Sequence, residues 1–171
     1  MIKIIKATIN HAELIAEIGK QSFWESHGES ASKTDISTFI SKTYTKDKLL
    51  VELENLKNIY HLIYYNNTIA GFSKIVLNTP NTNIENSNIT KLDRIYLLKA
   101  FYGKKLGAEL FDFNVKLAKK KEQKGIWLAV WVENLRAFNF YSKSGFKIVG
   151  KYDFQISSSH SNPNHIMYLT F

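Results

Sequence analysis

The sequence contains no cysteine, only two prolines and no long apolar run. Without cysteine there can be no disulfide framework, no thiolate-bound zinc or iron–sulfur cluster, and no covalent intermediate on a cysteine nucleophile. No apolar stretch approaches the roughly 20 residues that span a membrane, and no signal-peptide core is present. We therefore expect a cytoplasmic protein with no membrane partner. Since no Pro/Gly/Ser-rich linker divides the chain, we expect a single domain over residues 1–171.

Positive charge is in excess, with 23 Lys and Arg against 15 Asp and Glu. Residues 1–62 are balanced at eight Lys and eight acidic residues, whereas residues 99–124 carry eight Lys and three acidic residues. Such a segment suits nucleic acid, an anionic membrane or a phosphate-bearing small molecule. A basic nucleic-acid-binding domain without enzymatic activity is thus one alternative. The absence of any known nucleic-acid-binding signature argues against nucleic acid as the partner.

The apolar pattern predicts an α/β fold with a mixed, mostly antiparallel sheet and the order β-ααα-β-β-β-α-β-α-β-β. After a first strand, Asn10 is expected to cap a helix with Glu13 as its capping-box partner. Two further helices are expected near residues 34–44 and 49–56. Asn66-Asn67, between two apolar stretches, predicts a tight hairpin turn.

The middle of the chain predicts a strand, a helix and a second strand. The segments concerned are 92–98, a helix with apolar residues at 106, 110, 113 and 117, and the continuous apolar run 126–132. This order implies one parallel pair of strands with a right-handed crossover. A helix over 134–142, strands over 146–154 and 166–171, and a polar loop over 157–165 are expected to complete the fold.

Two segments carry residues suited to chemistry. The first joins strand 92–98 to the following helix and contains Gly103, Lys104, Lys105 and Gly107. The backbone N–H groups of such a turn, together with the positive end of the helix dipole, attract phosphate. The alternative is that the glycines only permit a tight turn and that the lysines are merely solvated.

The second segment follows the apolar strand 126–132 and reads Asn134-Leu135-Arg136-Ala137-Phe138-Asn139-Phe140-Tyr141, then Gly145-Phe146. Its simplest interpretation is an amphipathic helix that Asn134 caps and whose aromatic side chains fill a core. Tyr141 could belong to that core, because buried tyrosines with a bonded hydroxyl are common.

Together, the two segments resemble the signatures of the GNAT-type N-acetyltransferase superfamily. The family's phosphate-loop pattern R/Q-x-x-G-x-G/A aligns with Tyr102 to Gly107, and N-x-x-A-x-x-F-Y followed by G-F is matched throughout from Asn134 to Phe146. Two positions depart, since Tyr102 replaces Arg or Gln and Lys105 replaces the central Gly. A lysine restricts positive φ, although its ammonium could reach a phosphate. Residues 92–97 and those around Gly103 most resemble the spermidine/spermine N-acetyltransferase branch.

The resemblance implies that acetyl-CoA is the co-substrate, that no metal takes part, and that the acetyl group passes directly to a primary amine. The pantetheine arm would bind in a split between strands 92–98 and 126–132, and the pyrophosphate would bind the amides of residues 102–108. The residues implied for the cofactor are Tyr96, Leu97 and Leu98 on the strand, Tyr102, Gly103, Lys104, Lys105, Leu106, Gly107 and Ala108 in the turn, and Asn134, Asn139 and Tyr141 in the second motif. Tyr141 would also be the general acid for the departing thiolate.

The proton acceptor and the amine site are less defined by the motifs. Asp93 is a candidate general base, with an ordered-water route and an ion pair to Lys91 or Arg94 as alternatives. Trp24, Glu25 and Glu29 could hold a cationic amine by charge and cation–π contact, or could simply be solvated. The acceptor is expected to be a polyamine such as spermidine or spermine. The alternatives are a protein or peptide amine, an antibiotic amine, or a coenzyme A sensor without catalysis, and the sequence allows a homodimer.

Overall fold

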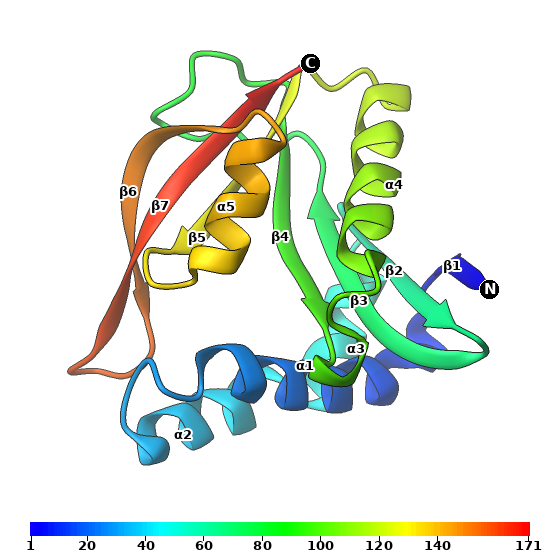
Figure 1. The fold of residues 1–171 in the computed structure, drawn as a ribbon, viewed down its shortest axis with the longest axis vertical. Coiled ribbons are helices and arrows are strands. Elements are labelled where there is room, and N and C mark those ends of the chain that lie inside the picture. Colours follow the sequence, from blue (N-terminus) through cyan, green and yellow to red (C-terminus); the bar gives the residue numbers. More distant parts are fainter. The chain divides into compact units, whose positions relative to one another are not determined.

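The computed structural model describes residues 1–171 and confirms a mixed α/β fold. In chain order the elements are β1 (Ile2–Lys6), the 3₁₀ helix η1 (Ile9–His11), α1 (Ala12–His27), α2 (Lys33–Thr43), α3 (Lys46–Glu54), β2 (Asn58–Tyr65), β3 (Thr68–Val76), β4 (Thr90–Leu97), the 3₁₀ helix η2 (Lys99–Phe101), α4 (Leu106–Lys120), β5 (Gly125–Trp131), α5 (Leu135–Lys143), β6 (Lys147–Gln155) and β7 (Ser161–Thr170) (Figure 1). The strand order is β1-β2-β3-β4-β5-β7-β6, and β4 and β5 form the parallel pair. No helix combines the length and the apolarity needed to cross a membrane.

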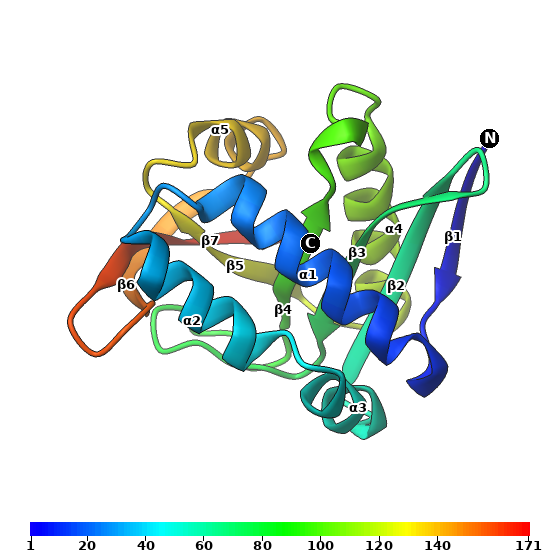
Figure 2. The same ribbon diagram turned by 90° about the horizontal axis from the view of Figure 1, so that it is seen from below.

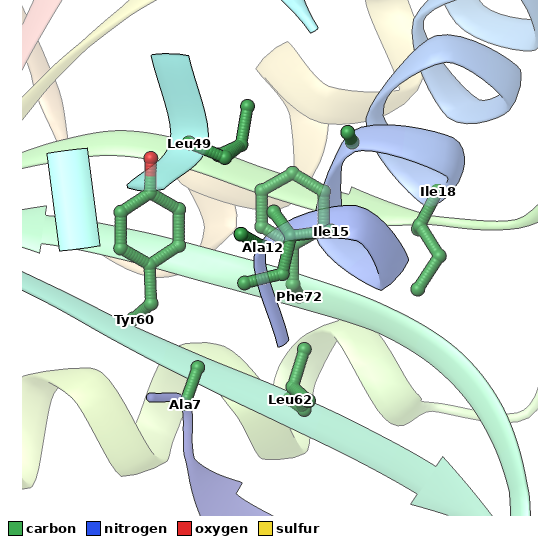
Figure 3. Close-up of a cluster of buried hydrophobic side chains, with 9 residues drawn as sticks. Ala7, Ala12, Ile15, Ile18, Leu49, Tyr60, Leu62 and Phe72 are labelled. Atoms are coloured by element: carbon green, nitrogen blue, oxygen red, sulfur yellow. The ribbon is translucent and has the colours of Figure 1, made fainter. Parts of the chain in front are cut away.

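The chain forms two compact units, Met1–Ile75 with Arg94–Asn114, and Val76–Asp93 with Val115–Phe171. In the first unit, the three N-terminal helices lie together (Figure 2), and α1 and α3 pack on β2 and β3 through buried apolar side chains. Figure 3 shows this core, with residues from α1, α3 and the two strands pointing toward one another: Ala12, Ile15, Ile18, Leu49, Tyr60, Leu62 and Phe72. Removing this apolar surface from water is the main force that holds the helices to the strands.

The expected cap of α1 is wrong, because the short 3₁₀ helix η1 precedes α1. Thr8, not Asn10, is the N-cap of η1, and its backbone N–H donates to Nδ1 of His11 at 3.0 Å. The capping box therefore pairs Thr8 with His11 rather than Asn10 with Glu13. A 3₁₀ turn placed before the helix moves the cap back along the chain, and apolar periodicity does not report it.

The other local expectations of the first unit are mostly confirmed. Asn66 and Asn67 have φ values of 47° and 64°, which is the left-handed geometry of a tight hairpin turn. The helix expected over 49–56 ends at Glu54, and Leu56 is 94% exposed rather than packed inward. The apolar spacing of the leucines was therefore misleading at its last member.

The second unit contains the antiparallel strands β5, β7 and β6, with α5 packed on β5 (Figure 1). Strand β7 begins at Ser161, so the second half of the expected polar loop 157–165 is strand instead. Asn162 and Asn164 are buried there, because β7 pairs with β5 on one side and with β6 on the other. Hydrogen bonding from two neighbouring strands stabilises a polar segment that has no strand pattern of its own.

Gln123, in the connection between α4 and β5, fixes the start of the parallel pair. Its side-chain oxygen accepts hydrogen bonds from the amide of Asn78 at 3.0 Å and from the hydroxyl of Thr90 at 3.2 Å. Its side-chain nitrogen donates to Asn78 at 2.9 Å and to Asn88 at 2.7 Å. The Asn-rich connection between β3 and β4 is thereby tied to the first residue of β4.

Candidate active site

A turn of residues 102–105, exposed from Gly103 to Lys105, joins η2 to α4. Gly103 has a φ of +79°, and a Cβ added there would meet no atom within 4 Å. Glycine is thus required by the backbone angle and not by crowding. On the far side of the turn, a Cβ on Gly107 would lie 3.4 Å from Leu97, so the first turn of α4 packs closely on β4.

The backbone amides of residues 103–108 lack an acceptor within the protein. Glu109 is the first residue of α4 whose N–H reaches an intrahelical acceptor, the carbonyl of Lys105 at 3.1 Å. The N–H groups of residues 103–108 donate to no group of the protein. Open amides at the positive end of a helix dipole form a favourable environment for a phosphate. The turn therefore has the donors that a pyrophosphate would need.

Lys105 occupies the left-handed region with a φ of +61°. The sequence suggested that a lysine at this position would restrict positive φ. The structure shows that the chain keeps the left-handed angle and accepts the steric cost of a Cβ there. The side chain of Lys104 does not cover the turn, because its ammonium lies 5.2 Å from the ring centre of Tyr65.

Strand β4 uses alternate residues to bind β3. The N–H of Leu98 donates to the carbonyl of Ala70 at 2.9 Å, and a Cβ on Gly71 would collide with the carbonyl oxygen of Tyr96. Because backbone groups alternate in direction along a strand, the N–H and C=O of Leu97 point away from β3. Of the three residues expected to pair with pantetheine, Leu97 is therefore the one with backbone groups on the outer side.

Helix α5 places the second motif as the capping interpretation predicts. Oδ1 of Asn134 accepts a hydrogen bond from the N–H of Ala137 at 3.2 Å, which leaves its side-chain NH₂ for another partner. Asn139 is exposed. Tyr141 is 7% exposed, and its ring lies 5.4 Å from the rings of Phe140 and Phe146. Its position is thus fixed by aromatic packing.

Asp93 forms an ion pair with Lys91, with 2.7 Å between Oδ1 and Nζ. The ammonium of Lys91 also lies 5.3 Å from the ring centre of Trp127. This is the ion pair that the sequence left open as the alternative to a general base. Both side chains are partly exposed, so the pair contributes little to stability.

Arg94 binds elsewhere, in a network that no sequence motif marks. Its guanidinium donates to Glu52 of α3 at 3.0 and 3.2 Å and to the hydroxyl of Tyr60 at 2.8 Å. Lys74 of β3 reaches the same carboxylate at 2.7 Å. Burial raises the pKa of Glu52, but Arg94, Lys74 and Tyr60 outweigh it and hold that pKa below its usual value. The network fixes α3 to β3 and β4.

In the segment expected to hold the amine, only some of the side chains are exposed. Trp24 is 42% exposed and Glu29 is exposed. Glu25 already accepts two hydrogen bonds, from the side chain of Gln21 at 2.9 Å and from the backbone N–H of Lys99 at 2.7 Å. Among the three residues, Trp24 and Glu29 are therefore the ones that face solvent.

Residues 21–146 match the Acetyltransferase (GNAT) family. The chain belongs to the GNAT acetyltransferase family. Spermidine N(1)-acetyltransferase of Thermoplasma acidophilum is 29% identical over 151 residues, which are 86% of this chain and 89% of the relative. An N-acetyltransferase of Lactobacillus delbrueckii subsp. lactis is 27% identical over 144 residues, 84% of this chain and 83% of the relative. The crystal structure of the PaiA N-acetyltransferase of Thermoplasma acidophilum with coenzyme A superposes with a TM-score of 0.79, at 27% identity over 100% of this chain and 99% of that one.

This GNAT protein is therefore an acetyl-CoA-dependent N-acetyltransferase. The open amides of residues 103–108 and the outward backbone of Leu97 fit a co-substrate that carries a pyrophosphate and an extended amide-containing arm. No group of three or more His, Asp or Glu side chains gathers where a metal ion could bind.

The lysines of the acetyltransferase's basic segment divide into two groups. Lys99, Lys104 and Lys105 precede α4, near the open amides. The other five, Lys116, Lys119, Lys120, Lys121 and Lys124, lie in the last turns of α4 and just after it. Since α4 has 15 residues and a helix rises about 1.5 Å per residue, it is about 22 Å long. The second group thus complements the negative end of the helix dipole and does not lie beside the open amides of residues 103–108.

His27, at the end of α1, is a residue that the sequence did not single out. Burial lowers its pKa to about 4, so the ring is neutral near pH 7. The hydroxyl oxygen of Ser26 lies 2.7 Å from the carbonyl oxygen of Ser22 and also 2.7 Å from Nδ1 of His27.

Proposed function

We propose that this acetyltransferase moves the acetyl group of acetyl-CoA directly to a primary amine of a polyamine such as spermidine or spermine. The observation that carries the proposal is the row of backbone amides over residues 103–108, at the start of α4, that have no acceptor within the protein. The similarity to a spermidine N(1)-acetyltransferase supports the choice of acceptor. Because the chain has no cysteine, an acetyl-cysteine intermediate is excluded, and direct transfer is the simplest route.

Several groups of this chain would hold the co-substrate. The amides of residues 103–108 would bind its pyrophosphate, with the ammonium of Lys105 nearby. The outward C=O of Leu97 would accept a hydrogen bond from the pantetheine arm, as in an added strand. The free NH₂ of Asn134 and the exposed amide of Asn139 would donate to the same arm. When bound, acetyl-CoA supplies a thioester that an amine can attack.

The side chains and backbone of this chain would then handle charge and protons. The N–H of Leu97 would stabilise negative charge on the acetyl oxygen. The hydroxyl of Tyr141 would donate a proton to the departing sulfur. The attacking amine must be neutral, and its proton would leave through ordered water, since the carboxylate of Asp93 is engaged by Lys91. The ring of Trp24 and the carboxylate of Glu29 would hold a second, cationic amine of the acceptor.

Replacing Tyr141 with Phe tests the proton donor. We expect coenzyme A affinity to change less than twofold, because the ring packing against Phe140 and Phe146 is kept. Turnover should fall at least tenfold, toward the lower end of general-acid effects. Tyr152→Phe is the matched control, because Tyr152 is 49% exposed on β6. Equal turnover in wild type and Tyr141→Phe would remove Tyr141 from the reaction.

An amine panel tests the acceptor. Purified protein is mixed with acetyl-CoA, and the release of free thiol is followed with a thiol reagent, to which this cysteine-free protein adds no background. Spermidine, spermine, aminoglycosides, free amino acids and a lysine peptide are compared at equal concentration. Faster thiol release with polyamines supports the proposal. Faster release with the peptide or an aminoglycoside instead indicates a protein or antibiotic amine as the acceptor. If no amine exceeds simple hydrolysis, a coenzyme A sensor without catalysis becomes the better interpretation.

A further inference from the structure

Glu25 joins the end of α1 to the start of η2. Its Oε2 accepts a hydrogen bond from the backbone N–H of Lys99 at 2.7 Å, and its Oε1 accepts one from Nε2 of Gln21 at 2.9 Å. Lys99 is the first residue of η2, and the N–H at such a position has no acceptor within its own helix. Gln21 lies one turn before Glu25 on α1, where side chains face each other, and so orients the carboxylate.

The segment that Glu25 binds has little stability of its own. Helix η2 has three residues, none of them buried, and its own hydrogen bonds run from Phe101 to Leu98 at 2.9 Å and from Tyr102 to Lys99 at 3.1 Å. Short 3₁₀ helices have poor hydrogen-bond geometry and depend on their surroundings. A carboxylate that accepts from a backbone N–H forms a charge-assisted bond, which is stronger than a neutral one. The tie to α1 therefore fixes where η2 begins.

We propose that Glu25 is a positioning residue for the cofactor turn and not a ligand of the amine. The proposal rests on the proposed function, in which the amides of residues 103–108 bind the pyrophosphate. Tyr102 directly follows η2 and the open amides come next along the chain, so the hydrogen bond at Lys99 sets the position of the whole turn. The acceptor's carboxylate ligand is then Glu29, which is exposed.

Loss of the hydrogen bond between Glu25 and Lys99 should lower cofactor affinity by changing the conformation of the turn in the unbound protein. When only a fraction of molecules holds the binding-competent turn, the apparent dissociation constant rises in inverse proportion to that fraction. A backbone N–H that loses its side-chain cap releases the first turn of the helix. We expect Glu25→Ala to weaken coenzyme A binding about five- to tenfold, within the range for a lost hydrogen bond at a partly exposed site. Glu25→Gln keeps an accepting oxygen and should weaken binding less than twofold.

Isothermal titration with coenzyme A alone compares the wild type, Glu25→Ala, Glu25→Gln and Glu17→Ala. Glu17 is the matched control, an exposed acid two turns earlier on α1, and its loss should not change affinity. Hydrogen exchange at the Lys99 amide gives a second readout without any ligand. That amide should exchange at least tenfold faster in Glu25→Ala and within threefold of wild type in Glu25→Gln. If Glu25→Ala does not fold, Gln21→Leu, which frees the carboxylate to rotate, should show the same changes in weaker form.

The outcomes separate this inference from the proposed function. Wild-type protein that does not bind coenzyme A would overturn the proposed function, while the exchange of the Lys99 amide would still test the tie. Glu25→Ala that binds coenzyme A like wild type would overturn the inference and leave the proposed function intact. A rise in the KM for the amine, with coenzyme A affinity unchanged, would return Glu25 to the amine site and also overturn the inference.

Discussion

Replacing Lys105 with Gly should stabilise the protein, although it removes a side chain. Lys105 has a φ of +61°, and its side chain is exposed. An L-residue in the left-handed region costs about 1–2 kcal/mol, whereas glycine adopts that region freely. Glycine also gains about 0.5–1 kcal/mol of conformational freedom in the unfolded chain, which offsets part of the benefit. We therefore expect the free energy of unfolding to rise by about 0.5–1 kcal/mol.

Thermal unfolding measures this change, with calorimetry and the fluorescence of the three tryptophans as probes. For a chain of this size, 1 kcal/mol corresponds to about 2–4 °C in Tm, so Lys105→Gly should raise Tm by about 1–4 °C. Lys105→Ala is the matched control, because it removes the same charge but keeps a Cβ in the left-handed conformation. Its Tm should stay within about 1 °C of wild type.

Two results would refute this reasoning. If Lys105→Gly is no more stable than wild type, the left-handed angle carries no cost at this position. If Lys105→Ala stabilises as much as Lys105→Gly, relief of repulsion with Lys104 is the cause instead. Coenzyme A titration of the same variants measures separately what the Lys105 ammonium contributes to cofactor affinity, because both variants lose that ammonium. A phosphate contact by Lys105 requires that both variants bind coenzyme A more weakly than wild type.

Two further predictions concern α5 and the buried His61. Asn134→Ala should lower the free energy of unfolding by about 1 kcal/mol, because the helix loses its cap. Asn134→Asp should keep the stability but weaken coenzyme A binding, because aspartate caps the helix without a side-chain NH₂. Equal stability of the two variants would contradict the capping role. Burial and the nearby Lys6 lower the pKa of His61 to about 4, outweighing Asn114, which raises it. Because that pKa lies below the unfolded value of about 6.5, the contribution of His61 to stability is full well above pH 6.5 and falls as the pH drops toward 4. Urea unfolding should show wild type losing about 2 kcal/mol more than His61→Phe between about pH 7.5 and about pH 5. Parallel losses would exclude His61 as the cause.

The two motif-bearing segments were predictable because each is built from interactions between near neighbours. The cap of α5 joins Asn134 to Ala137, three residues on. Gly103 and Gly145 have φ values of +79° and +94°, which glycine adopts without strain. The family signature lies in these same local segments, so the position of each motif at the end of a strand or the start of a helix followed from the sequence.

Contacts between distant parts of the chain were not predictable in the same way. Glu25 and Lys99 are 74 residues apart, and Glu52 and Arg94 are 42 apart. No local pattern distinguishes Glu25 from Glu29, because both are acidic residues in one segment at the end of the same helix. Only the fold decides which carboxylate meets a backbone amide and which faces solvent.

The sequence by itself determined the α/β class, the order of the elements, the Asn66-Asn67 hairpin and the two motifs, because side-chain periodicity and glycine angles act over a few residues. Tertiary structure decided that Ser161 to His165 form a strand, that Lys91 engages Asp93, and that Leu97 alone of its neighbours turns its amide outward. Each of these depends on which strand or side chain lies alongside, and hydrogen bonds and ion pairs form only where the folded chain brings their partners together.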